Sequence, residues 1–197
     1  MASDSKALLR NKAINTAIVF GAEENENRSF SLEAIAEAIQ EQAYPLYALF
    51  KTKENLLALA GEKVYEALSG KALELAKKEK SLHDFFNAYL DYLLQEPTYT
   101  LFTLHYGHGV PHIAPLADDR INHRKKVISD SMNVLKAYGI GPEEDDLLLW
   151  SYCLRHLVYF AGYLLQDPHS DTPENRFQSE SLITHGLKAF VIQGVEN

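Results

Sequence analysis

The sequence predicts an all-α fold. Between helix-breaking residues, apolar side chains recur at intervals of three and four, as at Phe85, Phe86, Tyr89, Leu90 and Leu93, and this spacing puts them on one helix face. Val, Ile and Thr form no alternating run between turn residues, and no Asn-Gly or Asp-Gly hairpin signal occurs. With 197 residues, 46% of them hydrophobic, the chain is long enough to bury one or two cores.

Capping and breaking residues predict the helices of the N-terminal part. Ser31 can accept hydrogen bonds from the free amides of the turn that follows it. Pro45 suits a first helical turn, because the amide that it lacks would have no helical partner there. A polar run from Glu23 to Arg28 indicates a loop. The predicted helices are Ser5–Glu23, Leu32–Ile39, Pro45–Phe50 and Lys53–Lys80.

The same signals predict the helices of the remaining chain. Ser81 caps one helix, which ends before Pro97. Gly141-Pro142 and four acidic residues open another, because acidic side chains favour the positive end of the helix dipole. The run His169–Asn175 indicates a loop. The predicted helices are Leu82–Gln95, Thr98–His105, Asp118–Tyr138, Pro142–Gln166 and Arg176–Gln193.

Two motifs near the N-terminus resemble those of the TetR family of transcriptional regulators. Phe30 to Ala38 is similar to the family's capped second helix. Leu46 to Leu57 is similar to the exit of its recognition helix, where an aromatic residue ends one helix, basic residues form a turn and an acid with leucines opens the next. The resemblance implies a three-helix helix-turn-helix DNA-binding head over residues 1–52. It also implies a ligand-binding and dimerisation body of six helices or so over residues 53–197.

The segment between these motifs departs from the family pattern. Gln40 stands where the family has a glycine that permits a left-handed backbone, so the turn is either strained or differently built. The run Gln40–Pro45 also lacks the usual basic and hydroxyl phosphate contacts. Residues 1–60 hold six basic and eight acidic residues, a net charge of −2, whereas a DNA-binding lobe is usually positive.

The resemblance implies which side chains of the head would meet DNA. Gln42 can pair with adenine, and Ala43 can touch a thymine methyl group. The alternative is that Tyr44 and Tyr47 pack the core of the head and that Lys51 and Lys53 are merely solvated. The groove candidates are Gln42, Ala43, Tyr44 and Tyr47, and the phosphate candidates are Ser31, Tyr47, Lys51 and Lys53.

An effector pocket is expected between the fourth and eighth helices of the fold. Its wall would be apolar with scattered hydroxyl and imidazole groups, and ordinary core packing is the alternative for each tyrosine. The candidates are Tyr65, Phe86, Tyr89, Phe102, His105, Tyr106, His112, Tyr152, His156 and Tyr159.

The last two long helices are expected to pair with their copies in a homodimer. Both carry wide apolar faces of the kind that suits an obligate twofold contact, and the alternative is that half of these residues belong to the core of one chain. The interface candidates are Trp150, Leu154, Leu157, Phe160, Ala161, Leu182, Ile183, Leu187, Phe190 and Val191.

Other classes of function fit the sequence less well. No metal or other cofactor is expected, because glycines and a proline between His105 and His112 break the helix that would fix ligand spacing. No nucleophile elbow, phosphate loop or zinc-protease motif occurs, so we expect no enzyme. The net charge of −8 argues against unspecific coating of nucleic acid. Arg155 and His156 lie near the centre of the apolar run Leu147–Leu165, which argues against a membrane span.

A cytoplasmic, homodimeric, ligand-responsive transcriptional regulator is therefore the expected function. The single Cys153 cannot form an internal disulfide, and Met1–Leu9 has no apolar signal core, which favours the cytoplasm. The expected partners are operator DNA, a small-molecule effector and a second copy of the chain. The alternative is a ligand- or protein-binding dimer of the same fold with weak or lost DNA binding.

Overall fold

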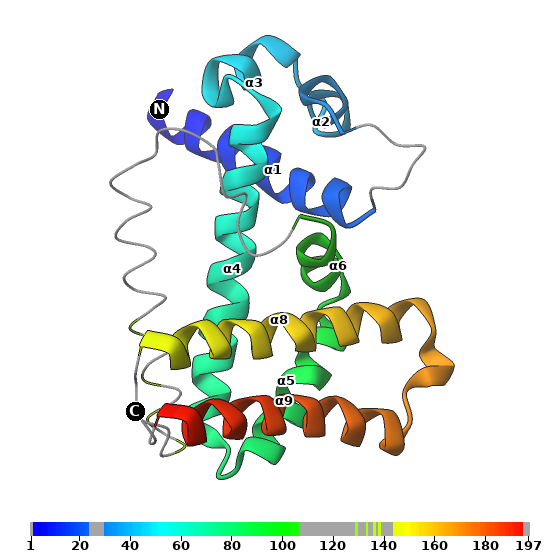
Figure 1. The fold of residues 1–197 in the computed structure, drawn as a ribbon. Helices are drawn as coiled ribbons and strands as arrows, with labels where there is room; N and C mark the ends of the chain where they lie inside the picture. Colours follow the sequence, from blue (N-terminus) through cyan, green and yellow to red (C-terminus); the bar gives the residue numbers. More distant parts are fainter. Residues whose placement is uncertain are drawn as a thin grey trace. The chain divides into compact units, whose positions relative to one another are not determined.

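The computed structural model consists of α-helices, and the residues that it describes include no β-strand (Figure 1). It describes residues 2–23, 30–106 and 144–194, with the isolated positions 129, 133, 136 and 138. The predicted helix Asp118–Tyr138 therefore lies almost wholly outside the described residues. Two compact units make up the chain: Met1–Ala67 with Thr98–Pro115, and Leu68–Pro97 with Leu116–Asn197. The division at residues 52 and 53 into a head and a body stays a prediction.

The first unit gathers three N-terminal helices and two further segments. They are α1 (Ala2–Ala22), α2 (Leu32–Ala38), α3 (Ala43–Phe50), the first part of α4 (Lys53–Lys78), and α6 (Pro97–Tyr106). The helix α2 packs against α1 and α3 (Figure 1). Their common core consists of small, branched and aromatic apolar side chains at most 2% exposed, among them Ala13, Ala17, Ile18, Ile35, Leu46, Phe50 and Leu56.

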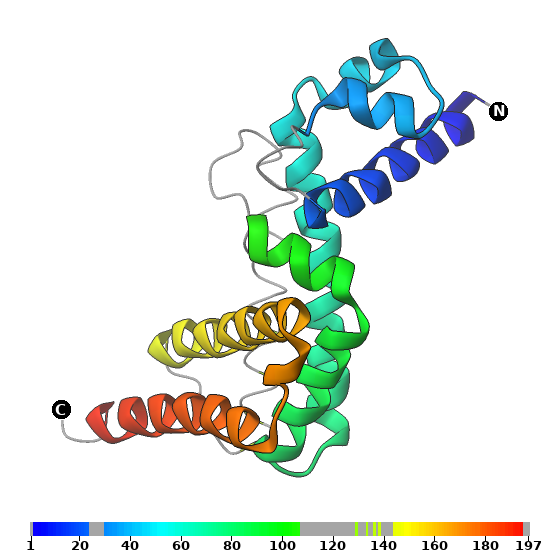
Figure 2. The same ribbon diagram turned by 90° about the vertical axis from the view of Figure 1, so that its right-hand side faces the viewer.

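The end of α1 lies close to α6, as Figure 2 shows for the blue and green ribbons. An imidazole nitrogen of His105 lies 2.8 Å from the carbonyl oxygen of Gly21. The Phe102 ring is fully buried beside Gly21 and lies 5.2 Å from the Tyr106 ring, measured between centroids. This approach depends on the missing side chain of Gly21.

The turn between α2 and α3 contains Gln40 in the left-handed region, with φ of 59°. The Gln40 amide donates to the Glu37 carbonyl, and the Glu41 amide donates to the Ala36 carbonyl. These two bonds form a Schellman motif, which closes the helix by placing a left-handed residue just beyond its end. Glycine takes this conformation without steric cost, but glutamine does not. The backbone therefore keeps the left-handed turn, and Gln40 bears the strain.

Replacing Gln40 with glycine is expected to raise the free energy of unfolding by about 1 kcal/mol, because it relieves this strain. The matched control is Ala38→Gly at the end of the same helix, which should lower the free energy of unfolding by about 1 kcal/mol. Urea denaturation of the three proteins measures both changes. Equal destabilisation by the two glycines would contradict a left-handed Gln40.

The junction between α3 and α4 also contains a strained residue. Lys51 has φ of 64° and ψ of −48°, and the Thr52 amide donates to the Phe50 carbonyl two residues before it, at 2.8 Å. This is a γ-turn of the rare, strained kind. The Asn55 side-chain amide donates to the same carbonyl at 2.8 Å, and the Thr52 hydroxyl caps the Asn55 amide at 3.3 Å. The predicted aromatic end, basic turn and new helix are therefore all present.

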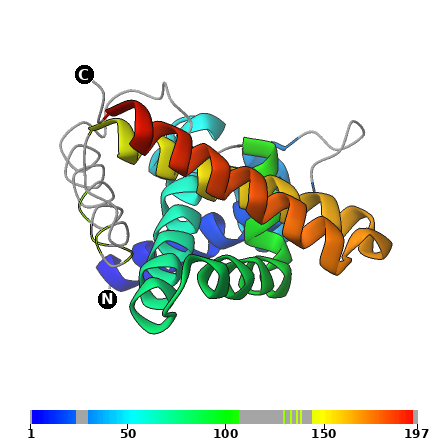
Figure 3. The same ribbon diagram turned by 60° about the horizontal axis from the view of Figure 1, so that its bottom comes forward.

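The second unit is built around α8 and α9. It contains the second part of α4, α5 (Leu82–Gln95), α8 (Glu144–Gln166), the short helix η1 (Pro168–Ser170), and α9 (Pro173–Gly194). The helix α8 packs against α5 and α9. The helices α8 and α9 run side by side (Figures 1 and 3). The core consists of buried aromatic and aliphatic side chains, among them Phe85, Tyr89, Leu93, Leu157, Ala161 and Ile183.

Ionic contacts join α5 to the start of α9. The Arg176 guanidinium donates to Asp91 on α5 at 2.7 Å and to Asp171 at 2.6 and 2.8 Å. An imidazole nitrogen of His83 lies 2.6 Å from a Glu180 carboxylate oxygen. The contact with Arg176 holds the pKa of Asp171 below its ordinary value.

Several helices begin at residues other than those predicted. The helix α3 begins at Ala43 rather than Pro45, so Pro45 lies within the first turn, where its missing amide still costs no hydrogen bond. The helix α9 begins at Pro173 rather than Arg176, and Thr172 caps it by accepting from the Asn175 amide. The caps predicted at Ser31 and Ser81 are present. Among the described residues, no helix combines the length and apolar character needed to cross a membrane.

Candidate functional site

The short helix α3 presents two tyrosines on its outer side. Tyr44 is 81% exposed and Tyr47 is 43% exposed, whereas Leu46 and Phe50 are buried in the first unit. Residues three apart in a helix lie on one face, so the two rings form one exposed aromatic strip. Tyr44 is therefore not a core residue of the first unit. Its ring is free for contact with a partner molecule.

The Tyr47 hydroxyl donates a hydrogen bond of 2.5 Å to a carboxylate oxygen of Glu33 on α2. This bond is the main reason that the pKa of Glu33 lies below, and the pKa of Tyr47 above, its ordinary value. Glu33 is thus ionised at neutral pH, and Tyr47 keeps its proton. The role of Glu33 could not be predicted from the sequence, because nothing in local spacing connects residues 14 positions apart.

Three of the predicted phosphate contacts already have structural roles. The Ser31 hydroxyl oxygen accepts from the Ala34 amide at 3.1 Å as the cap of α2. The Lys53 ammonium lies 5.7 Å from the centre of the Phe30 ring, a favourable cation–π distance. The exposed Lys51 forms the strained turn between α3 and α4. The cation–π contact leaves the Lys53 charge available to a phosphate, whereas a hydrogen bond from the Ser31 side chain also helps to lower the pKa of Glu33.

The remaining predicted contacts lie at the start of α3. Gln42 is exposed and makes no side-chain capping bond with that helix, and Ala43 is half-buried beside it. The exposed Glu33, Glu37 and Glu41 belong to α2 and the turn that follows it. The exposed residues of α2, α3 and the turn between them therefore combine aromatic rings and an amide with carboxylates.

The predicted effector residues are divided between the two units. In the first unit, Phe102 is buried against Gly21 and His105 is held by the Gly21 carbonyl. The buried Tyr106 hydroxyl has no hydrogen-bond partner among the described atoms. Tyr65 is half-buried on α4. His112 lies outside the described residues.

In the second unit, the predicted effector residues have core and surface positions. Phe86 and Tyr89 are buried, and the Tyr89 hydroxyl donates to the Leu68 carbonyl at 3.4 Å. His156 is half-buried, and this burial lowers its pKa. Tyr159 is 42% exposed and accepts from the Arg155 guanidinium at 3.1 and 3.3 Å. The Tyr152 side chain is outside the described part of the structure.

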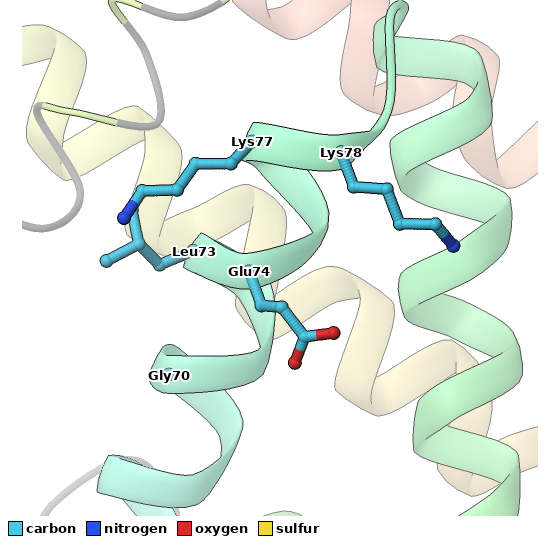
Figure 4. Close-up of a pocket in the computed structure, with 5 residues that line it drawn as sticks. All are labelled: Gly70, Leu73, Glu74, Lys77 and Lys78. Carbon is cyan, nitrogen blue, oxygen red and sulfur yellow. The ribbon is translucent and has the colours of Figure 1, made fainter.

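Two surface cavities of the second unit involve described residues, and neither is lined by a predicted effector residue. One, of about 390 Å³, follows the end of α4 at Gly70, Leu73, Glu74, Lys77 and Lys78 (Figure 4). The other, of about 580 Å³, lies between α5 and the start of α9. It is lined by His83, Asn87, Asp171, Thr172, Pro173, Arg176, Phe177 and Glu180.

The predicted dimer residues divide into buried and exposed groups. Leu157, Ala161 and Ile183 are buried within one chain, and Leu154 and Phe160 are half-buried. Leu182 is 67% exposed on α9, and Tyr159 and Tyr163 are 42% and 51% exposed on α8. A second copy would have these three exposed side chains to cover. The side chains of Trp150, Leu187, Phe190 and Val191 are outside the described part of the structure.

Cys153 is poorly suited to act as a nucleophile. Its thiol is buried, and burial raises its pKa to about 12, so it is protonated at neutral pH. Among the described residues, no group of three or more His, Cys, Asp or Glu side chains is arranged to hold a metal ion. His108 and His112 fall outside those residues.

The fold is similar to that of a TetR family transcription regulator from Marinobacter aquaeolei VT8. The two chains superpose with a TM-score of 0.62 over 94% of this chain and 96% of that chain, at 18% sequence identity. No protein-family model and no curated protein matches the chain. The likeness confirms the all-α, TetR-like fold that the sequence predicted, and at this identity it concerns the fold alone.

Proposed function

We propose that the chain is a ligand-responsive transcriptional regulator that binds DNA as a homodimer through the exposed face of α3. The observation that carries the proposal is the TetR-like fold over nearly the whole chain, in which α2, a left-handed turn and α3 stand where a helix-turn-helix reader is expected. The exposed Tyr44 and Gln42 supply a ring and an amide at the start of α3. In helix-turn-helix proteins, residues at the start of the second helix read base edges.

The proposal includes a dimer, because two reading heads must reach adjacent major grooves. Such grooves are roughly 34 to 36 Å apart, and an effector acts by favouring a spacing that fits them or one that does not. The exposed apolar side chains of α8 and α9 support a self-association surface in the second unit. A small molecule is the proposed effector.

The second candidate is a ligand- or protein-binding dimer of the same fold that does not bind DNA. The contact between Glu33 and Tyr47 favours it, because a carboxylate occupies a hydroxyl that was expected to hold phosphate. The net charge of −2 over residues 1–60 supports the same reading, since phosphate neutralisation supplies much of the affinity for DNA.

Binding to DNA from the chain's own upstream region, measured across a salt series, tests the proposal. Tyr44→Ala should weaken specific binding by about tenfold, the cost of one base contact. Lys53→Ala should weaken binding to all sequences and reduce the salt slope by about 1, as expected for a phosphate contact. Lys77→Ala removes the same charge from the end of α4 and is the control, with no change expected in the slope.

The absence of any shift at low salt, with and without candidate effectors, would reject the regulator and leave the second candidate. Equal effects of Lys53→Ala and Lys77→Ala would show that net charge, rather than a contact at the head, determines binding.

A further inference from the structure

An acidic side chain of α2 contacts the exposed aromatic strip of α3 at Tyr47. The Tyr47 hydroxyl donates to Glu33 at 2.5 Å, and both residues are exposed, so water and other molecules reach this pair. A tyrosine hydroxyl has one proton to donate. While Glu33 accepts that proton, Tyr47 cannot donate to a phosphate.

We propose that Glu33 is a negative determinant of DNA affinity, which withholds the Tyr47 hydroxyl from phosphate and sets a negative charge beside the reading helix. This inference rests on the proposed DNA binding and adds to it a residue that weakens the same site. A regulator with such a residue binds DNA less tightly than its contacts allow, and so is released more readily by an effector.

Two features of the first unit support an effect specific to Glu33. The bond from Tyr47 lowers the pKa of Glu33, so the carboxylate stays charged throughout the neutral range. Glu37 lies one turn further along α2 and is also exposed and acidic, but the Tyr47 hydroxyl donates to Glu33. Both acids would repel the DNA phosphates by their charge, whereas only Glu33 accepts the hydrogen bond of the Tyr47 hydroxyl.

Comparison of Glu33→Ala with Glu37→Ala separates these two effects. Both changes remove one negative charge from an exposed position of α2 and introduce the same strong helix former. At about 0.1 M salt, Glu33→Ala is expected to tighten DNA binding on the order of tenfold, and Glu37→Ala about twofold. Glu33→Gln removes the charge and keeps an acceptor for Tyr47, so its affinity should fall between those of the native chain and Glu33→Ala.

Tyr47→Phe completes the test, because it removes only the hydroxyl. In the native chain it should change DNA affinity less than about twofold, since Glu33 already holds that hydroxyl. In the Glu33→Ala background it should weaken binding about fivefold, because the freed hydroxyl then meets a phosphate. A thermal melt of each variant confirms that it is folded.

The outcomes separate this inference from the proposed function. Equal gains from Glu33→Ala and Glu37→Ala, or the same effect of Tyr47→Phe in both backgrounds, would overturn the inference and leave DNA binding in place. A native chain that does not bind at low salt while Glu33→Ala does would support the inference and reject the proposed function. Failure of every variant to bind at low salt would overturn both.

Discussion

Replacing Gly21 with alanine is expected to lower the free energy of unfolding by about 2 kcal/mol, within the range typical of overpacked cores. A β-carbon at Gly21 would lie 2.6 Å from one Phe102 ring carbon, 2.8 Å from another and 3.0 Å from a Tyr106 ring carbon. The Phe102 ring has no exposed surface and so cannot turn away into solvent. Chemical denaturation measures the loss. In the Gly21→Ala background, Phe102→Leu should recover part of it, because the smaller side chain makes room.

Gly70 supplies the control within the same chain. It lies on α4, where an added β-carbon would meet no atom within 4 Å. Gly70→Ala should therefore raise the free energy of unfolding by about 0.5 to 1 kcal/mol, because alanine loses less backbone entropy in a helix. A destabilisation by both alanines would show that the close approach of α6 to α1 does not set the requirement at Gly21.

Replacing Leu182 with glutamate is expected to convert the proposed homodimer into a monomer and to raise its dissociation constant at least about a hundredfold. Leu182 is 67% exposed on α9, so the change leaves the core of the chain intact. In a twofold interface the substitution acts on both subunits, and each buries a charge that has no partner. Sedimentation equilibrium at micromolar concentration measures the change.

Leu8→Glu is the matched control for this experiment. Leu8 is 59% exposed on α1 in the first unit, outside the proposed dimer surface, so its replacement by the same acid should leave the association unchanged. A native chain that is monomeric at these concentrations, or dissociation by both variants, would contradict a dimer formed through α9.

The helices could be predicted because the interactions that form them are local. Ser31 and Ser81 cap the amides three residues ahead, and Phe50, Lys51 and Thr52 end one helix and open the next as their order indicates. The position of Gln40 predicted either a strained or a different turn, and a Schellman motif keeps the left-handed backbone there in spite of the side chain. The start of α3 was misplaced because Pro45 is tolerated throughout a first turn, not only at its first residue.

The partners of the polar side chains could not be predicted in the same way. Tyr47 was expected to contact phosphate, and only the packing of α2 against α3 brings its hydroxyl to Glu33. Leu157 and Leu182 carry the same side chain in the same predicted interface, but one is buried within the chain and the other is exposed. Helical spacing assigns a residue to a face, and the neighbouring helices determine whether that face is covered.

The order of the helices thus follows from helix caps, apolar spacing and helix-breaking residues, all of which act over three or four residues. The same local signals account for the resemblance of the N-terminal part to a helix-turn-helix protein. The contacts that shape the candidate site span far larger separations: 14 residues from Glu33 to Tyr47 and 84 from Gly21 to His105. Such contacts depend on how helices approach one another in space, which no local pattern encodes. For that reason the order of α2, the turn and α3 could be predicted from the sequence, whereas the contact of Glu33 with Tyr47 is apparent only in the packed fold.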